Sequence, residues 1–150
     1  MAYSTILASC SKERVAAFRS NQQESLRASR IISVSHILAY WIQLEPLHEI
    51  LAEVIDGGEP LHRHFKHQFR DDMFHPAHQV PELHLRLKTS HEKALQEHQV
   101  PEDDWYRVQI EQMIELLAWA STNGEGVISL LGAPYNEATY ARTRKYPKLT

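Results

Sequence analysis

Six histidines stand within residues 61–84, and this density raises the question of a metal site. Side chains three or four residues apart share one face of a helix, and two pairs of histidines have this spacing. The pairs are His64 with His67, and His75 with His78. Imidazole nitrogens bind zinc at about 2 Å, so the pairs would form a site if the fold brought them together.

Asp71 and Asp72 lie between the two pairs, where they would act as a further ligand or as a base. A metal-dependent enzyme with a divalent metal such as zinc is therefore one hypothesis for this chain. The segment does not contain H-E-x-x-H, and Cys10 has no second cysteine beside it to complete a zinc site. A polar surface and a pH-sensitive switch are the other interpretations of these histidines.

Three histidines follow one another at intervals of seven residues, namely His84, His91 and His98. On a helix, neighbours at this spacing lie about 10 Å apart along the axis, too far to hold one metal ion. We expect them to line the solvent border of their helix or a partner surface. His36 and His48 stand in apolar segments, and we expect them to be core histidines.

An acidic row gives a different kind of candidate site. Glu45, Glu49 and Glu53 recur every four residues, so a helix would place them on one face, with Asp56 one turn beyond. Such a row is either a solvated helix face or an acidic surface for a basic partner. No cofactor is expected for a protein that binds its partner through such an acidic surface.

The C-terminal segment 133–150 is a basic tail that contains tyrosines. Its cationic residues are Arg142, Arg144, Lys145 and Lys148. A nucleic-acid-binding adaptor that uses this tail is a further alternative, because cationic side chains neutralise phosphates. The chain as a whole has a net charge of −3, which does not favour nucleic acid as a partner.

Composition indicates one soluble globular domain. The chain has 150 residues, of which 43% are hydrophobic and 23% charged, enough to build a core and too apolar for general disorder. Cys10 cannot form an internal disulfide, and a small buried apolar role suits it best. The sequence predicts neither a signal peptide nor a membrane span, so we expect a cytoplasmic protein.

The hydrophobic pattern predicts an α+β fold dominated by helices, with about four to five helices in a single domain. We expect strands at 2–9 and 126–131, which would pair with each other, and a loop at 59–80 with a short helical piece near 62–70. Five helices are predicted. They are residues 11–28, with Ser11 as the cap, a helix that begins after Ser35, the helix from Pro46 to Asp56, and the helices 81–98 and 103–122.

Two helices should form most of the core. In the helix that begins at Pro46, apolar residues recur at helical spacing at Leu47, Ile50, Leu51, Val54 and Ile55. In the helix at 103–122, we expect Trp105, Met113 and Leu117 to be largely buried on one side. That helix has the longest apolar surface in the chain and should therefore lie at the centre of the domain.

Three stretches carry a resemblance to a known family: 47–61 "LHEILAEVIDGGEPL", 75–95 "HPAHQVPELHLRLKTSHEKAL" and 109–132 "QIEQMIELLAWASTNGEGVISLLG". In these the chain resembles the YfbM-like family of small bacterial proteins of unknown function. The resemblance implies an α+β fold and supplies no catalytic residues. No nucleophile elbow, P-loop or dinucleotide fingerprint occurs either.

The leading hypothesis is therefore a non-enzymatic bacterial protein that binds another protein through its acidic helix face. A toxin-neutralising immunity protein is its concrete form, because such proteins are small and present acidic surfaces to basic effectors.

Overall fold

The computed structural model describes residues 4–20, 28–35, 38, 42, 44–61 and 72–131. Within them, the chain forms a five-stranded sheet in the order β2-β1-β5-β4-β3, with every neighbouring pair antiparallel. The strands are β1 (Ser4–Cys10), β2 (Arg30–Ser35), β3 (Glu59–Pro60), β4 (Met73–His75) and β5 (Gly126–Leu131). The expected pairing of the first and last strands is confirmed, since Leu7 of β1 lies opposite Ser129 of β5.

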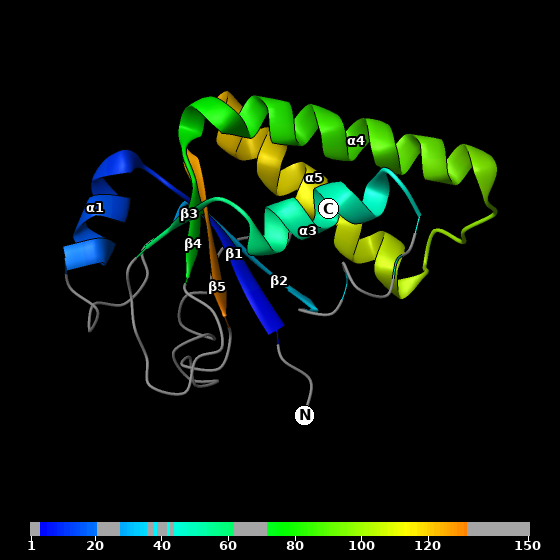
Figure 1. Ribbon diagram of the computed structural model, residues 1–150, viewed down its shortest axis with the longest axis horizontal. Helices are drawn as coiled ribbons and strands as arrows, with labels where there is room; N and C mark the ends of the chain where they lie inside the picture. Colours follow the sequence, from blue (N-terminus) through cyan, green and yellow to red (C-terminus); the bar gives the residue numbers. More distant parts are fainter. Residues whose placement is uncertain are drawn as a thin grey trace.

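Four α-helices accompany this sheet in the described part of the chain: α1 (Lys12–Ser20), α3 (Leu47–Asp56), α4 (Val80–Glu97) and α5 (Trp105–Thr122). A short 3-10 helix, Ala77–Gln79, leads into α4. Helices α3, α4 and α5 lie together on one side of the sheet, and α1 lies apart from them (Figure 1). The predicted helix-dominated α+β class is confirmed.

The two faces of the sheet belong to two cores, because side chains alternate along each strand. On one face, Leu7, Ile32 and Val127 pack with the residues of α3, α4 and α5. On the other face, Ile6 and Ile128 pack with Val15 of α1 and their neighbours. The larger core therefore holds the three helices in fixed positions relative to the sheet.

Helix α3 follows the sequence prediction closely. It begins after Pro46 and ends at Asp56, and all five of its expected apolar residues are buried. Gly58 then turns the chain with φ +102°, a backbone conformation that suits glycine. The buried stripe leaves the opposite side of α3 to the solvent.

Helices α4 and α5 form an antiparallel pair joined by a short turn (Figure 1). Asp104 caps α5, because its carboxylate accepts a hydrogen bond from the Arg107 backbone N–H at 3.0 Å. Met113 and Leu117 are buried as predicted. Trp105 was expected in the core, and this prediction is wrong, since it is 57% exposed.

Geometry explains the position of Trp105. Met113 lies eight positions after Trp105. At 3.6 residues per turn, the two side chains therefore point about 80° apart around the helix axis. Trp105 is also the first residue of α5, and the buried residues of this helix begin only at Gln109.

A second correction concerns residues 30–35, because the sequence pattern predicts no strand there and favours Ser35 as the cap of a helix. These residues form β2 beside β1, and the Ser35 N–H donates to Gln109 Oε1 at 2.6 Å. The loop predicted at 59–80 likewise contains β3 and β4. The helical piece near 62–70 and the tail 133–150 fall outside the residues that the structure describes, as does His36.

No described helix is both long and apolar enough to cross a membrane.

Candidate protein-binding surface

The acidic row predicted from the sequence lies on the outer side of α3 and the turn before it. Glu45 is exposed, and the side chains of Glu49 and Glu53 are 72% and 42% exposed. Because Leu47, Ile50 and the other apolar residues of α3 face the core, the spacing of four residues places Glu49 and Glu53 toward solvent, while Glu45 lies in the turn before the helix. Asp56, the fourth predicted binding residue, is half-buried at the end of the helix.

A basic side chain from the neighbouring helix enters this row. Arg86 of α4 donates through Nη1 to Glu53 Oε2 at 2.7 Å, and its Nη2 lies 3.9 Å from Glu49 Oε1. One guanidinium therefore serves two carboxylates, and the surface keeps an excess of negative charge. The pairs are largely solvated, so they contribute little to stability.

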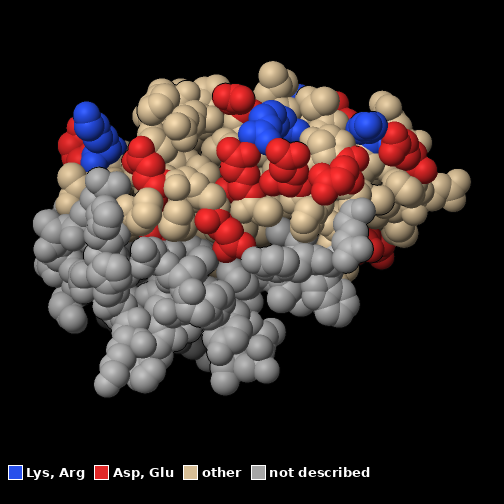
Figure 2. Space-filling model, in the orientation of Figure 1, with Lys and Arg blue, Asp and Glu red and all other residues tan. Residues whose placement is uncertain are grey.

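Figure 2 shows the wider setting of the row. Acidic side chains gather across the side of the molecule where α3 and α4 lie in Figure 1, with a small group of basic atoms among them. We call Glu45, Glu49 and Glu53 the α3 acidic face. Its geometry suits long-range attraction of a positively charged protein surface, which raises association rates more than it strengthens the final complex.

The histidine pairs proposed as a metal site are only partly within the described residues. His64, His67 and Asp71 belong to a segment whose placement the structure does not describe. His75 is buried on β4, whereas His78 is exposed in the short helix before α4. Among the described residues, no group of three or more histidine, cysteine or acidic side chains is arranged to hold a metal ion.

Buried His75 has structural contacts that account for its position. Its Nε2–H donates to the Val54 carbonyl at 3.2 Å, which joins β4 to α3. A Cβ added at Gly58 would lie 3.0 Å from His75 Nδ1, so the ring packs closely against that glycine. Burial lowers the pKa of His75, although the Val54 carbonyl and Glu53 favour the protonated form. Asp72, three residues before His75, is also buried.

The histidines at intervals of seven residues have three different environments. His84 is half-buried, and burial lowers its pKa, with a further contribution from the charge of Lys88. His98 is exposed at the end of α4. His91 is only 5% exposed, so its predicted place at the solvent border is wrong. His48, expected in the core, is half-buried, and its Nδ1–H donates to the Ile42 carbonyl at 3.1 Å.

His91 belongs to a charged cluster that joins α4 to α5. Its Nε2 lies 3.1 Å from Glu111 Oε2, and the Arg107 Nε–H donates to the same oxygen at 3.1 Å. Burial opposes ionisation of Glu111, but the hydrogen bonds from His91 and Arg107 outweigh it and lower the pKa of this carboxyl. Sequence spacing alone missed this cluster, because its members come from two helices.

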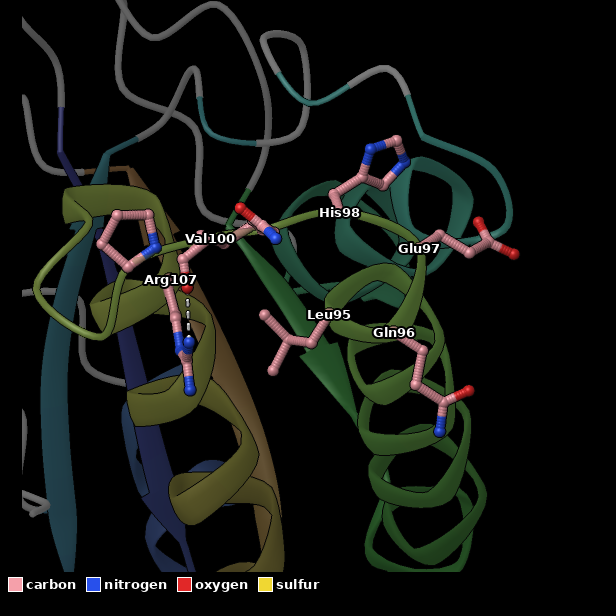
Figure 3. Close-up of a pocket in the computed structure, with 8 residues that line it drawn as sticks. Leu95, Gln96, Glu97, His98, Val100 and Arg107 are labelled. Carbon is pink, nitrogen blue, oxygen red and sulfur yellow. Dashed lines mark hydrogen bonds between the residues drawn. The ribbon is translucent and has the colours of Figure 1, made fainter.

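A pocket of about 730 Å³ opens where α4 ends and α5 begins. It is lined by Leu95, Gln96, Glu97, His98, Gln99, Val100, Pro101 and Arg107. In Figure 3, Leu95 points into the space between the two helices, whereas Glu97 and Gln96 point away from it. Arg107 closes one side, since its Nη1 donates to the Val100 carbonyl at 2.6 Å.

A further polar cluster ties the sheet together and was not expected from the sequence. Ser9 and Ser29 each donate a hydroxyl hydrogen bond to Glu125 at 2.7 Å, across segments far apart in the chain. Cys10 follows Ser9 and is fully buried. Burial, together with the nearby Glu125 charge, raises the pKa of its thiol to about 12, which leaves it without nucleophilic character near neutral pH.

Comparison with protein-family models, curated proteins and solved structures gives no match to this chain. The resemblance to the YfbM-like family therefore remains a prediction.

Proposed function

We propose that this protein is a non-enzymatic protein-binding module that meets a basic partner through the α3 acidic face. The observation that supports it best is the exposure of Glu49 on α3 and of Glu45 in the turn before it, beside a helix whose other side is buried in the larger core. A rigid helix that presents charge in fixed positions is well suited to recognition, because little conformational freedom is lost on binding.

In its concrete form, the proposal is an immunity protein that neutralises a basic toxin in the bacterial cytoplasm. Carboxylates on such a protein would pair with the lysine and arginine side chains of the toxin, and the pairing would hasten their encounter. Arg86 would hold Glu53 in place while Glu45 and Glu49 remain accessible for the partner.

The test is affinity capture from an extract of the native host, with the untagged chain immobilised by a coupling that does not use its amino groups. We expect the wild-type chain to retain one basic protein and a Glu45→Lys/Glu49→Lys variant to lose it. A Glu13→Lys/Glu92→Lys variant reverses two exposed carboxylates on α1 and α4 and should retain the partner. Recovery of no protein, or equal recovery by both variants, would contradict the proposal.

A further inference from the structure

The exposed side chain of Trp105 belongs to a second surface, outside the larger core. Trp105 is 57% exposed at the start of α5, and Val108, one turn later, is 39% exposed. Tryptophan side chains contribute strongly to protein–protein binding when they become buried on association. A large aromatic left in water at the end of a packed helix is therefore a candidate contact.

The pocket at the end of α4 adjoins the same first turn of α5. Its apolar lining comes from Leu95, Val100 and Pro101, and Arg107 lies two residues after Trp105. Leu95 points into the opening in Figure 3. The pocket lining and the tryptophan therefore belong to the same stretch of chain, residues 95–108.

The charge of this turn indicates what kind of segment fits. Residues 95–108 contain four carboxylates, at Glu97, Glu102, Asp103 and Asp104, and one guanidinium. That guanidinium, on Arg107, already contacts Glu111, so its charge is compensated within the protein. Glu102 and Asp103 are exposed immediately before the tryptophan. The electrostatic complement of this surface is positive.

We propose that the turn between α4 and α5 is a docking surface for a cationic segment of a partner protein. An apolar side chain of that segment enters the pocket beside Leu95, and its lysine or arginine residues meet Trp105 and the exposed carboxylates. A cation placed over a tryptophan ring is attracted by the ring's electrons, and adjacent carboxylates add to this attraction. The inference rests on the proposed function only for the class of the partner, since residues 95–108 include no member of the α3 acidic face.

The first experiment maps binding on the full-length ¹⁵N-labelled chain by amide chemical shifts. The probe is a short peptide of alternating lysine and leucine, and its control is the same peptide with glutamate in place of lysine. We expect saturable shifts in residues 95–108 with the lysine peptide and none with the glutamate peptide. Equal shifts with both peptides, shifts confined to α3, or no saturable shift would overturn the inference.

Variants test whether the tryptophan makes the contact. Trp105→Ala should weaken peptide binding about tenfold, as loss of an interface aromatic does, with an unchanged unfolding midpoint because the side chain is exposed. Leu85→Ala is the matched control, because Leu85 is 63% exposed on α4 and lies outside the turn. Equal affinity of the Trp105→Ala and Leu85→Ala variants would overturn the inference.

Two further measurements separate this surface from its alternatives. The Glu45→Lys/Glu49→Lys variant should bind the peptide with wild-type affinity. Loss of binding would place the peptide contact on α3 and overturn this inference, whereas the proposed function would still stand. Dilution of the labelled chain without peptide should leave the shifts of residues 95–108 unchanged. A concentration-dependent shift there would assign the surface to a second copy and overturn the inference.

Discussion

In the part of the chain that the structure describes, carboxylate–guanidinium pairs occur in two regions whose surroundings differ. On α3, Glu49 and Glu53 share Arg86 at a solvated surface, with the glutamates 72% and 42% exposed. Between α4 and α5, Glu111 pairs with Arg107 and with the buried side chain of His91. The same chemistry therefore gives a surface available to a partner in one region and a structural link between helices in the other. Glu53 and Glu111 are equally exposed, at 42%, so the difference lies in their basic partners: His91 and Arg107 are 7% and 19% exposed, against 35% for Arg86.

The largest expected effect lies in the core that supports both regions. Leu117 is 1% exposed at the centre of α5, so Leu117→Ala should lower the free energy of unfolding by about 2–5 kcal/mol. The loss combines transfer of the removed atoms with the cavity left behind. Urea denaturation measures it, and Leu85→Ala on the exposed side of α4 should change stability by less than about 0.5 kcal/mol. A small effect of Leu117→Ala would mean that α5 is not central to the core.

The pair of His91 with Glu111 should come next. His91→Ala removes a hydrogen-bond partner of Glu111 and empties a buried site, so we expect a loss of about 1–3 kcal/mol in the free energy of unfolding. Urea denaturation again provides the value. Replacement of exposed His98, the residue that follows α4, by alanine is the control and should have almost no effect. Equal stabilities of the two variants would show that the link between α4 and α5 carries no free energy.

The burial of His75 predicts that the free energy of unfolding depends on pH. Its folded-state pKa is lowered by burial, so its contribution to stability is complete above the unfolded value of about 6.5 and is lost as pH falls through the folded value. A His75→Gln variant should be less stable at neutral pH and should lose less stability between pH 7 and pH 5 than the wild type. His78→Gln, at an exposed position, should retain the wild-type slope. Parallel slopes for all three proteins would contradict the assignment.

The exposed pair should give the smallest effect. Arg86→Ala removes the guanidinium shared by Glu49 and Glu53, yet solvent screens these charges and the loss should stay below about 1 kcal/mol. Its difference from wild type should shrink further in high salt. A loss as large as that of His91→Ala, measured by the same urea denaturation, would show that the α3 surface is structural.

Local periodicity was sufficient where a helix packs along its whole length. The buried stripe of α3, the bounds of α4 and the last strand could all be predicted, because each depends on spacing within one segment. The same spacing predicted Glu49 and Glu53 of the α3 acidic face, whereas Glu45 lies in the turn before the helix. Charged residues on the side opposite a buried stripe remain exposed unless a neighbouring helix covers them.

The error at Trp105 came from helix geometry within α5, whereas the other errors depend on partners far away in sequence. Residues 30–35 form a strand because β1 lies beside them, although their apolar run also fits the start of a helix. His91 is buried because α5 crosses the middle of α4, a contact that a seven-residue spacing does not contain. The pairing of Glu125 with Ser9 and Ser29 likewise joins three separate segments.

The most direct test of the central claim measures partner affinity and stability on the same two variants. Using the captured partner, Glu45→Lys/Glu49→Lys should raise the Kd at least about tenfold, and more at low salt than at high salt. Its unfolding midpoint should remain close to that of the wild type, as should both properties of the Glu13→Lys/Glu92→Lys control. An unchanged Kd, or a loss of affinity that merely follows a loss of stability, would contradict the account.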